Sequence, residues 1–454
     1  MKLLKNYLIF NVLFLSAILA FKEHALAFCG FYIGKADTKL FNEASKVVVV
    51  RDGNRTVISM ASDFKGELKE FALVIPVPTM IKEDQIHVAS NALIDHLDSY
   101  TAPRLVEYYD ENPCEPIYRM RELGMPAGEA SDGSSLAKAK SLGVKIEAEY
   151  TVGEYDIVLL SATQSDGLGI WLNENGYKMP ENAKPVLESY IKQNTKFFLA
   201  KVNLKEQSKL GFNFLRPLQV AFESPKFMLP IRLGTVNANG SQEMFVFMLT
   251  KNGRVETTNY RTVKIASDIE VPNFIKDEFG SFYKTLYNKQ VEKEGRRAVF
   301  LEYAWDMGWC DPCAADPLSN SELKELGVMW LDEANELAQN NMFGNIQGQR
   351  VFVTRLHLTY DKDHFPEDLI FNETADKTNF QARYIIRHPW TGSDSCKEAD
   401  KYRENLKNKN ISLAKSLAEN TGWNLEEIST KMNLSSIDLK NPANSDWWKS
   451  IWKK

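Results

Sequence analysis

The stretch EMFVFMLTKNGRVETTNYRTVKI, residues 243–265, decides the fold class that we predict for this chain. Its two halves, Glu243–Thr250 and Arg254–Ile265, are rich in β-branched and aromatic residues, which favour strands. Asn252-Gly253 lies between the halves, and Asn-Gly is typical of the tight turn of a β-hairpin. The stretch therefore predicts two antiparallel strands that form part of an antiparallel sheet.

The same pattern continues towards the amino terminus. Asp52-Gly53-Asn54 separates KVVVVR from RTVISMA, and Asn239-Gly240 precedes the stretch quoted above, so both predict tight turns. We expect residues 28–270 to form a mainly antiparallel, sandwich-like β domain. Its remaining predicted strands are Lys46–Arg51, Arg55–Ala61, Phe71–Val77, Lys145–Thr151, Tyr155–Ala162, Leu218–Phe222 and Phe227–Val236.

Helical patterns become more common after Pro272. Within Asn273–Glu294 the apolar residues recur at helical spacing, and Ser319 with Glu322 matches a capping box. Residues 271–454 are therefore predicted to be a mixed domain, and the whole chain an α+β protein. The other predicted elements are strands at Arg297–Ala304, Arg350–Tyr360 and Phe380–Arg387, and helices at Ile86–Tyr109 (split by Pro103), Glu181–Asn194 and within Lys397–Met432.

The first 27 residues resemble a secretory signal peptide. Lys2 and Lys5 precede a mostly apolar run over Tyr7–Phe21, and Ala25-Leu26-Ala27 matches the small-residue pattern of a cleavage site. The apolar run is shorter than the roughly 20 residues that a membrane-spanning helix needs. We therefore expect residues 1–27 to be removed and the protein to be exported to the periplasm or the extracellular medium.

Composition narrows the class of protein. The chain of 454 residues holds 55 Lys and Arg against 60 Asp and Glu, a net charge of −5, and 44% of its residues are apolar. These values are typical of a folded globular protein and argue against a disordered chain. The mild acidity argues against a nucleic-acid partner. No segment after the leader is long and apolar enough to predict a transmembrane helix.

Five cysteines follow the leader: Cys29, Cys114, Cys310, Cys313 and Cys396. In an exported protein all five are disulfide candidates, and their odd number means that at least one is unpaired within the chain or pairs outside it. Trp309-Cys310-Asp311-Pro312-Cys313 is similar to the thioredoxin motif, so a redox-active pair is one interpretation. We favour a structural disulfide, either within this pair or from one of its members to Cys396 or Cys114. A zinc site is not favoured, since two further ligands are not evident.

An acidic loop follows the predicted strand Arg350–Tyr360. It contains Asp361, Asp363, His364, Glu367 and Asp368, and dense carboxylates can bind a hard cation. The loop lacks the glycine and terminal glutamate of an EF-hand, so we favour a solvated acidic loop and predict no metal. No local Ser/His/Asp signature, phosphate-binding loop or dinucleotide-binding motif is present, and we predict no cofactor.

The carboxyl terminus is rich in tryptophan. Trp447, Trp448 and Trp452 lie along one face of a short predicted helix that also carries lysines. Such a helix can contact a membrane surface, but it spans about two turns. We therefore favour docking onto the protein's own core, with membrane-surface contact as the alternative.

Several strings together resemble one bacterial family. They are Phe28–Tyr32 (FCGFY), Phe71–Pro78 (FALVIPVP), Gly169–Tyr177 (GIWLNENGY), Trp309–Cys313, Leu326–Val328 and Arg387–Trp390 (RHPW). The chain is similar to the uncharacterised family catalogued as domain of unknown function 2330. The resemblance implies an exported protein without an assigned activity, so no catalytic residues can be transferred.

We accordingly favour a non-catalytic binding or envelope-structural module over an enzyme. The alternative is a thiol–disulfide oxidoreductase that uses Cys310 and Cys313.

Overall fold

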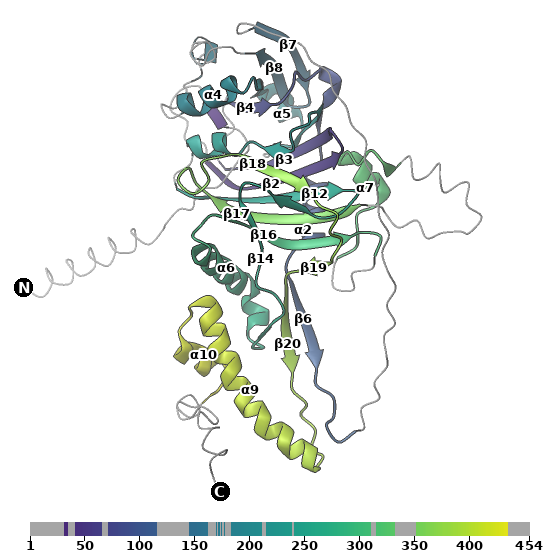
Figure 1. Ribbon diagram of the computed structural model, residues 1–454, viewed down its shortest axis with the longest axis vertical. Helices are drawn as coiled ribbons and strands as arrows, with labels where there is room; N and C mark the ends of the chain where they lie inside the picture. Colours follow the sequence, from purple (N-terminus) through teal and green to yellow (C-terminus); the bar gives the residue numbers. More distant parts are fainter. Residues whose placement is uncertain are drawn as a thin grey trace, which may run out of the picture.

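A computed structural model of the chain describes residues 31–34, 41–65, 71–115, 145–161, 183–210, 215–237, 240–309, 315–331 and 351–434, with the single positions 169, 171, 172, 174 and 177. The predicted α+β class is confirmed, because several β-sheets stack along the long axis and helices gather at the carboxyl-terminal end (Figure 1). None of the helices in this described part is long and apolar enough to cross a membrane.

A mixed sheet of nine described strands occupies the centre of the molecule (Figure 1). Its β12–β2 and β14–β16 pairs are parallel, and the other pairs are antiparallel. Since β16 and β17 follow residue 270, the segments 28–270 and 271–454 share this sheet. Its order is β14 (Arg261–Lys264), β16 (Ala298–Asp306), β17 (Phe352–Tyr360), β12 (Gln242–Thr250), β2 (Phe41–Asp52), β3 (Arg55–Lys65), β10 (Leu218–Glu223) and β5 (Ile86–Val88), with β19 (Phe380–Gln381) beside β16.

The hairpin predicted around Asp52-Gly53-Asn54 is confirmed. β2 and β3 pair up to Asp52 and Arg55, and Gly53 has a φ of +56°, which glycine adopts without strain. The four valines of KVVVVR are all buried, and alternate ones join clusters on opposite faces of the sheet. An uninterrupted apolar strand is what a sheet covered on both faces requires.

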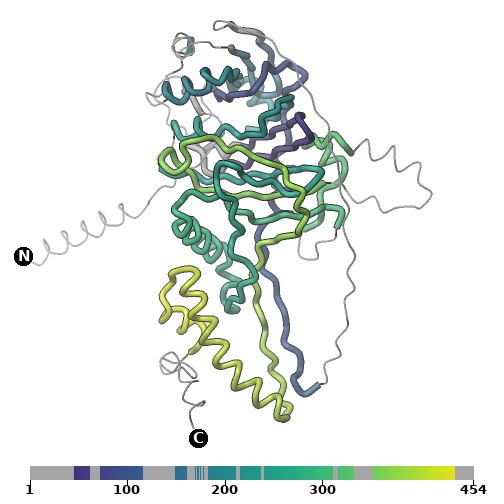
Figure 2. Tube along the Cα trace, viewed as in Figure 1, coloured from purple at the N-terminus to yellow at the C-terminus, as the bar shows by residue number. Residues whose placement is uncertain are grey.

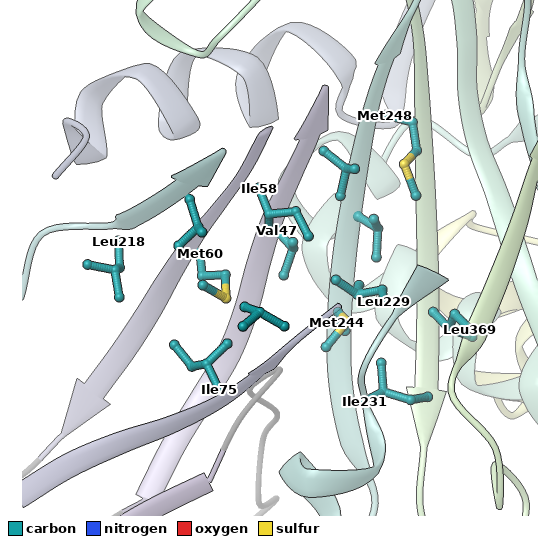
Figure 3. Packing of buried hydrophobic residues seen from close by; sticks show 14 of the residues in the cluster. Val47, Ile58, Met60, Ile75, Leu218, Leu229, Ile231, Met244, Met248 and Leu369 are labelled. Atoms are coloured by element: carbon teal, nitrogen blue, oxygen red, sulfur yellow. The ribbon is translucent and has the colours of Figure 1, made fainter. Parts of the chain in front are cut away.

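A second sheet covers one face of the central sheet (Figure 1). Ile75 and Ile157 from this second sheet pack with Val47 and Ile58 from the central one, and Figure 3 shows part of this core. Helix α4 (Ala183–Lys192) covers the outer face through Leu187. The strand order is β1 (Phe31–Gly34), β4 (Phe71–Val77), β9 (Lys196–Val202), β8 (Tyr155–Ser161) and β7 (Lys145–Val152), and α5 (Leu204–Lys209) follows β9.

Helices cover the opposite face of the central sheet. α2 (Asn91–Thr101) and α7 (Asn320–Glu325) pack against Val48 and Val50, and α6 (Ile275–Lys293) packs against β16. The predicted capping box of α7 is confirmed, because Ser319 and Glu322 exchange hydrogen bonds. The core of this half is therefore built between the sheet and helices.

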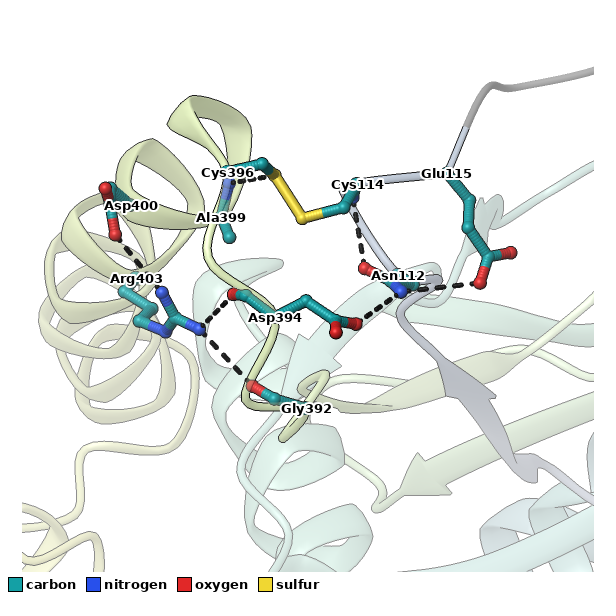
Figure 4. The surroundings of a disulfide bond; sticks show 9 residues. All are labelled: Asn112, Cys114, Glu115, Gly392, Asp394, Cys396, Ala399, Asp400 and Arg403. Atoms are coloured by element: carbon teal, nitrogen blue, oxygen red, sulfur yellow. Dashed lines mark hydrogen bonds and ion pairs between the residues drawn. A yellow bond between two sulfur atoms is a disulfide. The ribbon is translucent and has the colours of Figure 1, made fainter.

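A narrow lobe extends away from the central sheet (Figures 1 and 2). It contains the parallel strands β15 (Ile269–Val271), β20 (Arg383–His388) and β6 (Arg104–Tyr109), with α9 (Lys397–Thr421) and α10 (Leu425–Lys431) beside them. A disulfide joins Cys114, beyond the end of β6, to Cys396, the N-cap of α9 (Figure 4).

A further small sheet has three described strands. It consists of β11 (Met228–Leu229), β18 (Leu369–Glu373) and β13 (Val255–Thr257). Two short 3-10 helices, η1 (Glu83–Gln85) and η2 (Arg232–Asn237), precede β5 and follow β11 respectively.

The hairpin predicted at Asn252-Gly253 is wrong. β17 and β2 already pair with both edges of β12, so Arg254–Ile265 forms the separate strands β13 and β14, which pair elsewhere. Gly253 is needed for a different reason. A Cβ there would lie 2.5 Å from the carbonyl oxygen of Thr374, so only glycine allows this close approach.

Two other element predictions are also wrong in part. Phe227–Val236 was predicted as one strand, but β11 ends before Pro230, which has no N–H to donate, and a 3-10 helix follows. Ile86–Tyr109 was predicted as helix, but only Asn91–Thr101 is helical. The strands β5 and β6 flank it, because Ile86–Val88 pairs with β10 and the chain after Pro103 pairs with β20.

Candidate functional site

An apolar hollow lies between the two main sheets, and we call it the apolar chamber. It has a volume of about 230 Å³. Ile58 and Met60 of β3 and Ile75 of β4 are labelled in Figure 3 and form part of its wall. The other side chains that line it are Pro76, Val77, Pro78, Thr79, Tyr190, Gln193, Asn194, Thr195, Val220, Phe222, Ser224, Pro225, Lys226, Met228, Leu229 and Pro230.

A second hollow, the polar groove, adjoins the chamber and has a volume of about 760 Å³. It lies between the β2–β3 turn and β18, and its lining contains both signs of charge. The lining residues are Arg51, Gly53, Gln193, Pro225, Lys226, Phe227, Met228, Arg232, Glu367, Asp368, Ile370, Phe371, Asn372 and Glu373.

The two hollows share a border. Gln193, Pro225, Lys226 and Met228 line both of them. The two hollows are therefore neighbours, and we call them together the cleft.

Asp368 fixes the wall of the cleft. Its Oδ1 accepts hydrogen bonds from the Tyr190 hydroxyl (2.6 Å), the Ile231 N–H (3.0 Å) and the Arg232 N–H (3.1 Å). Burial raises the pKa of Asp368, although these hydrogen bonds oppose the shift. This carboxyl group thus connects α4, the start of η2 and β18.

Arg51 is the most deeply buried charged side chain in the lining of the groove, with 5% of its surface exposed. Its Nη1 donates to Thr56 Oγ1 (2.6 Å) and to the Asn54 carbonyl oxygen (3.3 Å), and its guanidinium lies 5.1 Å from the centre of the Phe227 ring. Burial lowers the pKa of Arg51, while the charge of Glu373 opposes this shift.

A separate network of charges is buried on the helix-covered face of the central sheet. Glu302 on β16 accepts hydrogen bonds from Arg355 Nε (2.6 Å) and interacts with His357 Nδ1 (2.5 Å), both on β17. His357 also contacts Glu243 (2.8 Å), and Arg355 contacts Asp98 (2.5 Å). These contacts link the sheet to helix α2.

The charges in this network are mutually stabilised. Burial disfavours ionised Glu302, but His357 and Arg355 outweigh it and lower the pKa of Glu302 to about 2. Burial also disfavours the charged imidazole of His357, yet Glu302 and Glu243 raise its pKa above the usual value.

Neither the chamber nor the groove reaches Glu302, Arg355 or His357. The His357 ring lies between Tyr287 and Phe245, with centroid distances of 3.7 and 4.2 Å. Glu302 and His357 are buried and lie outside both hollows, so we take the cleft as the better candidate site.

The structure brings together two of the five candidate cysteines. Cys114 and Cys396 form the disulfide, a pairing that the sequence had left open (Figure 4). Cys29, Cys310 and Cys313 lie outside the described residues, as do the leader 1–27 and Trp447, Trp448 and Trp452. The expected alternative of a disulfide from Cys310 or Cys313 to Cys396 or Cys114 is wrong, because Cys114 and Cys396 are bonded to each other. The other interpretations that rest on residues outside the described ranges stay predictions.

The acidic loop directs its carboxylates to different partners. Asp361 accepts hydrogen bonds from the backbone N–H groups of Asp363 and His364 and contacts His364 Nδ1 at 2.8 Å. Asp368 is turned towards Tyr190 in the cleft wall, away from this cluster. Within the described ranges no group of three or more metal-binding side chains is arranged to hold an ion.

Sequence reasoning missed the cleft residues Arg51, Lys226 and Arg232. Of these three residues, only Arg51 could have been selected from the sequence, because this arginine directly follows a run of four valines. Charged side chains are rarely buried unless they are paired or functional. Lys226 and Arg232 had no such context, because their position beside Arg51 depends on tertiary structure.

Comparison with known proteins gives one match. The family described as "Uncharacterized protein conserved in bacteria (DUF2330)" matches residues 24–372. The match covers all of the cleft except Glu373 and ends before β20 and α9. No curated protein and no solved structure matches the chain.

Proposed function

Since the chain belongs to the DUF2330 family of uncharacterised bacterial proteins, we propose a function from its own geometry. The protein is an exported, non-catalytic binding protein, and its cleft takes up an organic ligand with an apolar end. The observation that carries this proposal is the apolar chamber between the two sheets, which adjoins a wider polar groove.

The size of the chamber limits the apolar end of the ligand. An apolar cavity of about 150 Å³ is known to hold benzene, and the chamber has about 230 Å³. It therefore accommodates an aromatic ring or a short acyl chain. A larger polar body has room in the groove of about 760 Å³.

Two features support export. The leader has the three parts of a secretory signal, and Ala25 and Ala27 match a cleavage site. The disulfide between Cys114 and Cys396 is of a kind that persists in oxidising compartments.

A series of linear alcohols from 1-butanol to 1-decanol tests the binding function. Each buried methylene contributes about 0.8 kcal/mol, so the affinity should rise about fourfold per carbon. The rise should stop once the chain fills the chamber. Isothermal titration calorimetry measures both the slope and the length at which it levels off.

Two variants locate the binding to the chamber. Thr79 is half-buried in the chamber lining, so Thr79→Trp should fill the entrance and weaken octanol binding at least tenfold. Thr285→Trp places the same ring on a half-buried position of α6, away from the cleft, and should leave binding unchanged. If no alcohol binds, or if both variants bind octanol equally well, the chamber is not the site.

A further inference from the structure

Arg51 has an unusual environment for a buried cation. Only 5% of its surface is exposed, yet no carboxylate of the described residues lies within 4.0 Å of its guanidinium nitrogens. Its hydrogen-bond acceptors, Thr56 Oγ1 and the carbonyl oxygen of Asn54, are neutral, and both accept from Nη1. A buried charge without an ionic partner is costly, and such a group commonly serves an anionic ligand.

Two further cations line the groove that Arg51 faces. Lys226 is exposed at the border with the chamber and has no ion-pair partner among the described residues. Arg232 donates to the Ser189 hydroxyl at 2.6 Å and lies over the Tyr190 ring. The groove therefore offers three positive side chains, and the side-chain hydrogen bonds of Arg51 and Arg232 go to neutral groups.

The carboxylates of the groove are already engaged. Asp368 Oδ1 accepts three hydrogen bonds from the protein, and Glu373 Oε1 accepts one from the Asn252 N–H at 2.7 Å. Glu367 lies at the exposed edge, where it contacts Asn259. The cationic donors available to an incoming anion are thus Arg51, Lys226 and Arg232.

We propose that the ligand is an amphipathic anion, with its carboxylate or phosphate head against Arg51 and Lys226 in the groove and its apolar chain in the chamber. This inference rests on the proposed binding function and adds the charge of the ligand to it. Arginine suits both head groups, since its planar guanidinium pairs with carboxylate and phosphate oxygens. Lys226 lines both hollows and therefore lies where head and chain join.

Three ligands with the same octyl chain test the charge: nonanoate, octyl phosphate and the neutral 1-octanol. At least one anion should bind more tightly than octanol, and the tighter anion identifies the head group. Arg51→Met should weaken that anion about tenfold to a hundredfold, the usual worth of hydrogen bonds to charged groups. It should leave octanol within about twofold.

Arg55→Met is the matched control. Arg55 lies across the same turn but pairs with Asp52 and does not line the groove, so affinity for the anions should not change. Circular dichroism and cooperative unfolding establish that each variant folds. If Arg51→Met does not fold, Lys226→Met provides the second test, since it should weaken the anion several-fold at low salt and less at high salt.

The outcomes separate the two proposals. If octanol binds and neither anion binds more tightly, or if Arg51→Met weakens octanol as much as the anions, the anionic ligand is excluded while the binding function stands. If none of the three ligands binds, the binding function itself is excluded.

Discussion

At the scale of single residues, the clearest features are two buried arginines with opposite environments. Arg355 has Glu302 and Asp98 within 2.6 Å, whereas Arg51 has only neutral partners. The first is explained by the fold itself, because its charge is balanced within the sheet. The second has no carboxylate of the described residues within 4.0 Å, although the more distant charge of Glu373 acts on it, and this difference is why we assign function to Arg51.

His357 predicts a pH dependence of stability. Its pKa is raised in the folded protein, so its contribution is complete below the unfolded value of about 6.5 and is lost as pH rises through the folded pKa. The pKa of Glu302 is lowered to about 2, so its contribution is present above the unfolded value of about 4.5 and is lost towards pH 2. The network should therefore stabilise most between about pH 4.5 and 6.5.

Urea unfolding of the wild type and His357→Gln at several pH values measures this contribution. The difference in unfolding free energy should shrink as pH rises above about 6.5, by about 1.4 kcal/mol per unit of pKa shift. A difference that stays constant as pH rises would show that folding does not raise the pKa of His357.

At the scale of elements, glycines show how context overrides local sequence. Gly253 follows Asn252 in a pattern typical of hairpins, but it does not have positive φ and its backbone packs against Thr374 and Asp376. Gly280 is inside helix α6, where an added Cβ would meet no atom within 4 Å.

These two glycines should respond oppositely to alanine. Gly253→Ala forces Cβ against backbone and should destabilise the protein by about 1–3 kcal/mol. Gly280→Ala removes a helix-breaking residue from an open site and should stabilise it by about 0.5–1 kcal/mol. Thermal or urea unfolding measures both changes. Equal effects of the two substitutions would contradict the close approach at residue 253.

At the scale of the whole molecule, the narrow lobe depends on contacts between distant parts of the chain. Cys114 and Cys396 are separated by 282 residues, and their bond attaches the start of α9 to the end of β6. Around it, Asn112 donates to Asp394, and Arg403 donates to the carbonyl oxygens of residues 392 and 394 (Figure 4).

Loss of this disulfide should loosen the lobe selectively. Replacement of Cys114 and Cys396 by serine removes a constraint worth about 2–5 kcal/mol. Hydrogen exchange should become faster in α9, while β12 and β17 in the central sheet keep their protection. A reducing agent should reproduce the effect in the wild type and add nothing in the double variant. Unchanged exchange in α9 would show that its packing alone holds the lobe.

Local patterns determined much of the secondary structure. The hairpin of β2 and β3, the strands β4 and β8, the helix α6 and the capping box of α7 follow from alternation, turn residues and helical spacing. These signals involve residues close in sequence, so they do not depend on how distant parts of the chain pack together.

Only the tertiary structure decided which strands are neighbours and where the cleft lies. β12 pairs with β2 and β17, which are far from it in sequence, and this excludes the hairpin that Asn252-Gly253 predicts. Likewise, Arg51, Lys226 and Asp368 come from separate segments and meet at one groove. Sheet pairing and burial depend on the packing of the whole chain, so a linear sequence indicates that Arg51 is unusual but not what lies beside it.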